Sequence, residues 1–85
     1  MVSKELTADI KNDGDVTPAA RLVQIASRFD SSIYINQENK KVNAKSIMGM
    51  MALGIADGDR ITITADGPDA EAAIAELAKY LVVND

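Results

Sequence analysis

The most informative segment of this sequence is Val42-Asn43-Ala44-Lys45-Ser46-Ile47-Met48-Gly49-Met50-Met51-Ala52-Leu53-Gly54. Ser46 is well placed as a helix N-cap, because a serine hydroxyl can accept a hydrogen bond from a backbone N–H of the first turn. Gly54 suits the left-handed conformation in which many helices end. The segment therefore predicts a short helix from Ile47 to Leu53.

Two short strands precede this helix. Residues 33–36 alternate between apolar and polar side chains, as a strand with one buried face does. Residues 37–39 form a turn, and residues 40–43 return as a strand around Val42. Because the two strands are separated by so few residues, they predict a β-hairpin.

A strand and a longer helix are expected before the hairpin. Residues 3–10 alternate, which predicts a half-buried strand. Thr17 and Pro18 read as an N-cap followed by proline in the first helical position, so the helix should run over about residues 17–28. The inward side chains of the strand would be those of Leu6, Ala8 and Ile10.

A last strand and a last helix follow Gly54. Ile61, Ile63 and Ala65 alternate with threonines, which predicts a strand, and Gly67-Pro68-Asp69 precedes a helical apolar pattern. The predicted order is β-α-β-β-α-β-α. It indicates an α+β fold in which three helices cover one face of a four-stranded, mostly antiparallel sheet, and residues 1–85 should form a single domain.

Composition excludes several classes of function. The net charge of −4 argues against direct binding of nucleic acid, which needs a basic face. With no cysteine there is no disulfide framework and no thiolate metal site. The longest apolar run, residues 47–55, is too short to span a membrane, and without a basic stretch followed by an apolar one near residue 1 we expect no signal peptide. We expect a cytoplasmic protein without a metal or another cofactor.

The absence of histidine is the most informative count. Imidazole is the commonest general base at neutral pH and a common metal ligand. A chain without it cannot carry a phosphate on histidine. Whatever this protein does, it does without imidazole.

The segment from Val42 to Gly54 closely resembles the regulatory-serine segment of the HPr family, the phosphocarriers of the sugar phosphotransferase system. It is particularly similar to the HPr-like regulators that lack the active-site histidine. The resemblance covers essentially the whole chain and implies an open-faced β-sandwich. Further residues that carry it are Pro18-Ala19, Leu22-Val23-Gln24, Ala26-Ser27 and Asp66-Gly67.

One loop departs from the family pattern. The family has glycine, an aliphatic residue, histidine, alanine, arginine and proline, whereas this chain has Asp13-Gly14-Asp15-Val16-Thr17-Pro18. Asp15 thus falls on the histidine position and Thr17 on the arginine position. An aspartyl phosphate on Asp15 is possible chemistry, so a carrier role for Asp15 stays as an alternative. No other catalytic residue is expected, and the resemblance without its histidine implies a regulatory binding protein and not an enzyme.

Ser46 has two interpretations. By resemblance, it is the site that an HPr kinase/phosphorylase phosphorylates, after which the protein binds a transcriptional regulator or a metabolic enzyme. Alternatively, it is an ordinary N-cap that stabilises its helix by about 1 kcal/mol. The surrounding sequence favours regulation.

The residues expected to bind partners lie around this serine. A two-turn helix buries one stripe, so Met50 and Leu53 should belong to the core while their neighbours reach solvent. By resemblance, this surface meets the kinase and a LacI-type catabolite control protein. The expected contact residues are Arg21, Gln24, Lys45, Ile47, Met48 and Met51.

Two further points stay open at this stage. The surface could act as a constitutive interaction module without any modification, or the methionines could merely fill the core. Histidine-free relatives can also exchange their first strand, so the protein is expected to be a monomer or a strand-swapped dimer through residues 3–10.

Overall fold

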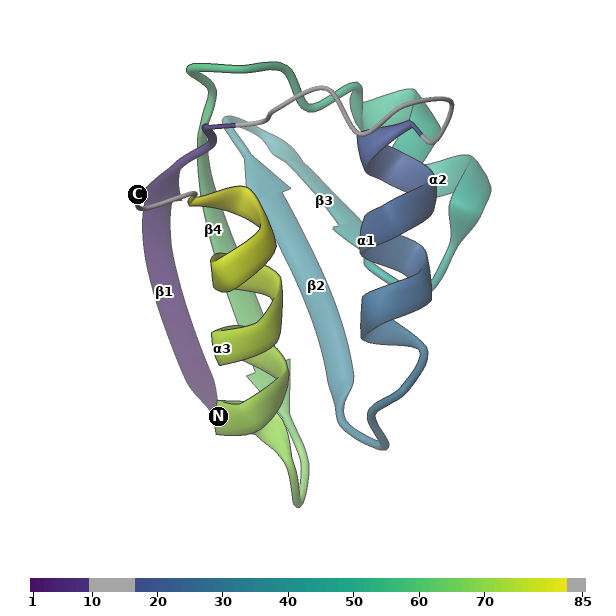
Figure 1. The fold of residues 1–85 in the computed structure, drawn as a ribbon, viewed down its shortest axis with the longest axis vertical. Helices are drawn as coiled ribbons and strands as arrows, with labels where there is room; N and C mark the ends of the chain where they lie inside the picture. Colours follow the sequence, from purple (N-terminus) through teal and green to yellow (C-terminus); the bar gives the residue numbers. More distant parts are fainter. Residues whose placement is uncertain (10–16, 83–85) are drawn as a thin grey trace.

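The computed structural model describes residues 1–9 and 17–82. These residues form four strands and three helices in the predicted order (Figure 1). Their bounds are β1 Val2–Thr7, α1 Pro18–Ala26, β2 Ser32–Gln37, β3 Lys40–Asn43, α2 Ile47–Leu53, β4 Arg60–Asp66 and α3 Ala70–Leu81.

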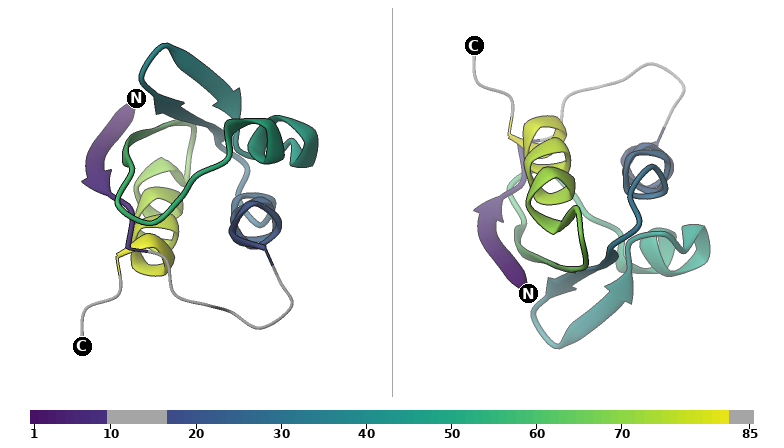
Figure 2. Two further views of the ribbon diagram at one scale, coloured as in Figure 1. Left: turned by 90° about the horizontal axis from the view of Figure 1, so that it is seen from above. Right: turned by 90° about the horizontal axis from the view of Figure 1, so that it is seen from below.

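The four strands form one antiparallel sheet in the order β1-β4-β2-β3. In this register Leu6 of β1 lies opposite Ile61 of β4, and Ile35 of β2 lies opposite Ile63. All three helices lie on one side of the sheet, with α1 between α3 and α2 (Figure 2). The predicted open-faced α+β architecture is therefore confirmed.

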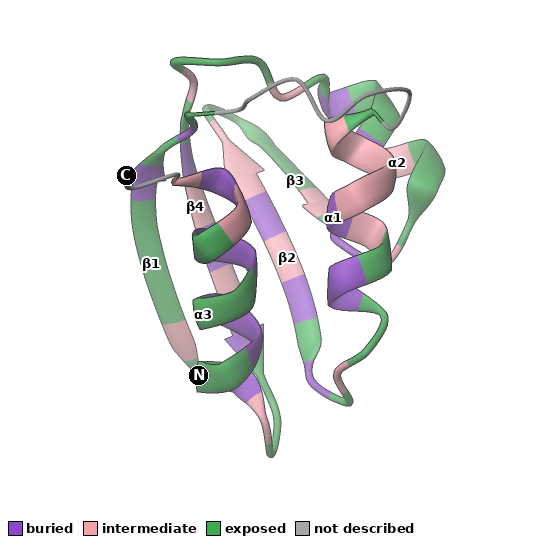
Figure 3. Cartoon of the chain, in the orientation of Figure 1, coloured by how far each residue is buried: buried purple, intermediate pink, exposed green. Residues whose placement is uncertain are grey.

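The core lies between this helical layer and the sheet (Figure 3). Alternate residues of a strand point to opposite faces, so β2 and β4 bury every second side chain. Tyr34 and Thr64 belong to the other, open face, where the Lys41 ammonium lies 4.7 Å from the centre of the Tyr34 ring. The largest fully buried apolar side chains are Leu22, Ile33, Ile35, Met50, Ile61, Ile63, Leu77 and Leu81.

The element bounds differ from the predictions mainly at the N-terminal strand. The ladder of β1 ends at Thr7, and Asp9 forms only an isolated parallel bridge with Val82. The predicted inward residues Leu6 and Ala8 are buried, while Ile10 lies outside the described residues. Helix α1 ends at Ala26 because Ser27 is its C-cap.

A hydrogen-bonded latch joins the loop before β2 to the start of α3. The Asp69 carboxylate accepts hydrogen bonds from the backbone N–H groups of Asp30 and Ser31, both at 2.9 Å, and from the Ser31 hydroxyl. The Asp69 N–H donates in turn to the Ser31 hydroxyl at 3.2 Å. Ser31 is fully buried, so the latch satisfies polar groups that have lost water.

Gly67 passes directly over this latch. Its φ of 152° is rarely adopted by residues with a side chain, and a Cβ atom there would lie 2.5 Å from the Ser31 Oγ and 2.6 Å from the Ser31 Cα. Only glycine allows the two backbones to approach this closely.

We predict that Gly67→Ala destabilises the protein by about 1–3 kcal/mol, because it adds a steric clash to backbone strain. Gly58→Ala is the matched control, since Gly58 also has a positive φ, of 93°, but no atom lies within 4 Å of its added Cβ. Urea unfolding of both variants measures the difference. Equal losses would contradict the close approach to Ser31.

The latch also predicts a pH dependence. The hydrogen bond from the Ser31 hydroxyl, followed by that from the Asp30 N–H, lowers the pKa of Asp69 below its ordinary value of 3.8, against a smaller opposing effect of burial. A lowered folded-state pKa adds stability that is present above the unfolded pKa and is lost as the pH falls through the folded pKa. Asp69→Asn should therefore flatten the fall of Tm below about pH 4, and an unchanged slope in a series of thermal melts would refute this.

Candidate functional site

The hydroxyl of Ser46 lies exposed at the start of α2. Ser46 is the N-cap, with extended backbone angles, and the Gly49 N–H donates to its Oγ at 3.2 Å. The turn before it is set by Asn43, which accepts hydrogen bonds from the Lys45 N–H at its side-chain oxygen (2.8 Å) and from the Ser46 N–H at its carbonyl (3.0 Å). The helix ends at Gly54 with a φ of 63°. Both predicted caps of α2 are confirmed.

Three large apolar side chains are exposed on α2, the helix that begins after this serine. Ile47, Met48 and Met51 are 42%, 81% and 62% exposed, and we call them the methionine surface. Met50 and Leu53 are buried against the rest of the core, as predicted. The exposed side of α2 is visible in Figure 3. A protein of this size rarely exposes such side chains together without a use for them.

Helix α1 packs against α2 and contributes the neighbouring polar residues. Arg21 is half-buried and Gln24 is exposed, and the Arg21 guanidinium donates to the Gln24 side-chain oxygen at 3.4 Å. They project from the same helix face, one turn apart. Both therefore lie on an accessible part of the helical layer, as the sequence predicts.

Lys45 has a defined partner of its own. Its ammonium donates to the Phe29 carbonyl at 2.7 Å, in the turn that follows α1. Lys45 is partly buried, and this hydrogen bond holds its charge beside the turn that follows α1. The sequence predicted Lys45 as a partner-contact residue and could not reveal this long-range hydrogen bond.

The loop that departs from the family pattern is described only at its end. Asp13 and Asp15 lie outside the described residues. Thr17 is the N-cap of α1, with its hydroxyl accepting from the Ala20 N–H at 3.2 Å. An apolar hollow of about 230 Å³ lies between Thr17 and Met51, bounded also by Pro18 and Ile55. The threonine at the family's arginine position thus has a structural role.

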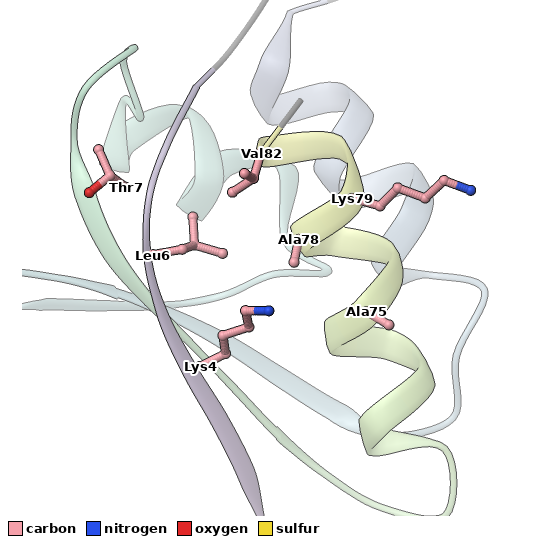
Figure 4. A pocket seen from close by; sticks show the side chains of 7 residues that line it. All are labelled: Lys4, Leu6, Thr7, Ala75, Ala78, Lys79 and Val82. Carbon is pink, nitrogen blue, oxygen red and sulfur yellow. The ribbon is translucent and has the colours of Figure 1, made fainter. Parts of the chain in front are cut away.

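A larger groove, of about 610 Å³, lies between β1 and α3 (Figure 4). Leu6, Ala78 and Val82 line it, Lys4 points into it from β1, and Lys79 extends away from it. Lys4 belongs to an edge strand, where an inward-pointing charge discourages pairing with other chains. Lys79 lies in the last turn of α3, where a cation complements the helix dipole. Both lysines thus have structural explanations.

Within residues 1–9 and 17–82, no group of three or more histidine, cysteine, aspartate or glutamate side chains could hold a metal ion. No helix in that part of the chain has the length and apolar character needed to cross a membrane.

Fold and site together define the class of this protein: a small α+β protein with an open-faced antiparallel sheet and an exposed serine at the start of its second helix. The family model described as the PTS HPr component phosphorylation site matches residues 2–82. The chain belongs to the HPr family.

One relative of this chain is HPr-like protein Crh of Bacillus subtilis (strain 168). It is 41% identical over 81 residues, which cover 95% of this chain and 95% of that protein. Crh of Halalkalibacterium halodurans is 43% identical over 81 residues, with 95% and 96% covered. The resemblance to the HPr family, and to Crh within it, is therefore confirmed.

Solved structures agree with the fold. The phosphocarrier protein HPr of Bacillus anthracis str. Ames matches with a TM-score of 0.87 and 48% identity, covering 95% of this chain and 96% of that one. A crystal structure of Bacillus subtilis Crh, described as a swapped-domain, intertwined dimer, matches with a TM-score of 0.70 and 41% identity, covering 89% and 83%.

We predict that the two kinds of methionine in α2 respond differently to truncation. Met50→Ala should cost about 2–5 kcal/mol because it leaves a cavity in the core, whereas Met48→Ala should stay within about 0.5 kcal/mol. Urea unfolding of the two variants measures both. A large loss in Met48→Ala would mean that this side chain packs in the core and is not free to meet a partner.

Proposed function

We propose that this protein is an HPr-like regulator of carbon catabolite control. An HPr kinase/phosphorylase phosphorylates it on Ser46, and the modified protein then binds a LacI-type catabolite control protein or another regulator or metabolic enzyme. In this role it is a cytoplasmic binding protein and neither an enzyme nor a histidine phosphocarrier.

The observation that carries the proposal is an exposed N-cap hydroxyl beside the methionine surface, in a chain with no histidine. A phosphate on Ser46 would add about −1.5 to −2 charges at neutral pH and three acceptor oxygens. Those oxygens would appear next to Ile47, Met48 and Met51, so modification changes the chemistry of one continuous surface. Such a change suits a switch for binding.

The methionine surface supports partner binding by its composition. Methionine side chains are flexible and polarizable, and they adapt to more than one partner. Arg21, Gln24 and Lys45 would form polar edges of the contact. With a net charge of −4, the protein would act on transcription through a protein partner and not by binding nucleic acid itself.

The contact with the partner depends on the loop before α1, and the oligomeric state depends on β1. Thr17 replaces the family's arginine, so the partner's contact there would differ from that of the family's phosphocarriers. This protein would be a monomer or a strand-swapped dimer, and the solved Crh dimer with a swapped domain supports the second form. In the described structure, β1 pairs with the β4 of its own chain.

We predict that incubation with ATP and an HPr kinase/phosphorylase adds one phosphate, and that Ser46→Ala abolishes it. Ser3→Ala is the control, because Ser3 is an exposed serine of β1, at the opposite edge of the sheet from β3, against which α2 packs. Intact-mass spectrometry measures the incorporation. No phosphate on the wild-type protein would refute the proposal.

Two further experiments distinguish this proposal from its alternatives. Incorporation that survives Ser46→Ala, arises from phosphorylated enzyme I of the phosphotransferase system and is released by hydroxylamine would indicate a carrier role for Asp15. Identical partners for the modified and unmodified protein in pull-downs would indicate a constitutive interaction module.

A further inference from the structure

Gly49 lies in the first turn of α2, three residues after Ser46, with its backbone beside the serine side chain. Its N–H donates to the Ser46 Oγ at 3.2 Å. A Cβ atom added at Gly49 would lie 3.4 Å from that Oγ, 3.6 Å from the Ser46 Cβ and 3.5 Å from the Val42 Cβ. The missing side chain is therefore a gap directly beside the hydroxyl.

Neither backbone nor packing requires glycine here. Gly49 is inside a helix and has no positive φ, unlike Gly54, Gly58 and Gly67. The three distances are ordinary van der Waals contacts, so alanine would fit the unmodified protein. Glycine also destabilises a helix relative to alanine. This position commonly carries glutamate or glutamine after an N-cap serine, and α2 has no acidic residue in its first turn.

We propose that Gly49 is a specificity-determining residue for phosphorylation, because its missing side chain leaves the Ser46 hydroxyl open to the phosphoryl donor. This inference rests on the proposed function of Ser46. In the transfer, the Oγ forms a bond to the γ-phosphorus of ATP, the bond to the leaving ADP oxygen breaks, and the hydroxyl proton passes to a base of the kinase.

The space around the Ser46 Oγ explains why alanine at position 49 would slow phosphorylation. Reacting atoms must approach to about 3–3.5 Å before transfer. A methyl group 3.4 Å from the Oγ occupies part of the same shell around the hydroxyl. It would also stand beside the Gly49 N–H, the donor next to which the new phosphate oxygens must lie. Alanine at 49 therefore leaves the resting protein intact but obstructs the transfer.

The test uses the full chain with Gly49→Ala, and Ala52→Ser as the matched control. Each change adds one heavy atom to α2, and Ala52 is exposed on the same helix. We expect Gly49→Ala to keep or raise the Tm and to lower kcat/KM for phosphorylation by an HPr kinase/phosphorylase with ATP at least tenfold. The loss should fall mainly on kcat, because the methionine surface that the kinase would contact is unchanged.

Each outcome decides the question. Unchanged kcat/KM in a folded Gly49→Ala protein overturns the inference while Ser46 phosphorylation stands. A lowered Tm, with kcat/KM restored at a temperature where the variant is folded, makes Gly49 a packing residue against Val42 and also overturns it. A wild-type protein that takes up no phosphate overturns the proposed function itself, and the inference with it.

Discussion

A helix of seven residues can bury only one stripe of side chains, and the candidate site depends on this limit. In α2 the stripe consists of Met50 and Leu53, which anchor the helix to the core. Its other large apolar side chains must then face solvent, directly after the serine that begins the helix. The same N-cap hydrogen bond that starts α2 holds the Ser46 hydroxyl at the surface. The anchoring side chains, the exposed side chains and the hydroxyl proposed for modification therefore belong to one helix of about two turns and its N-cap.

What could be predicted from the sequence was local. Ser46 and Gly54 mark the ends of α2 because capping depends on residues within one turn, and alternation placed Ile61 and Ile63 in the core because a strand has a period of two. Contacts between residues far apart in the chain produce no periodic pattern in the sequence from which they could be predicted. The latch joins Ser31 to Asp69, and the Lys45 ammonium reaches the Phe29 carbonyl, so neither could be found without the fold. The end of α1 at Ala26 was predicted two residues too late, because the chain continues past it in tighter turns in which Arg28 and Phe29 donate to carbonyls three residues back.

The replacement at position 17 combines a loss with a gain. An arginine there would offer a guanidinium fork for phosphate, and a threonine cannot. Thr17 instead caps α1 through its hydroxyl, a role that arginine does not fill. A chain without histidine has no phosphohistidine for a guanidinium to stabilise. Threonine at position 17 can therefore cap the helix without impairing phosphate transfer through histidine. The first turn of α1 thus serves helix stability. The side-chain hydrogen bond on the surface of this helix, from Arg21 to Gln24, begins one turn later.

The first turn of α2 is organised in the opposite way. Local stability would favour alanine or glutamate over Gly49, and polar residues over Met48 and Met51 on an exposed face. None of these three residues is explained by the packing of the isolated protein, since Met48 and Met51 are exposed and the Cβ missing at 49 would meet only ordinary contacts. Natural sequences depart from local optima where another requirement applies. Three departures within five residues of one exposed hydroxyl would share a single cause under the proposed function, which needs access both for a modifying enzyme and for a partner.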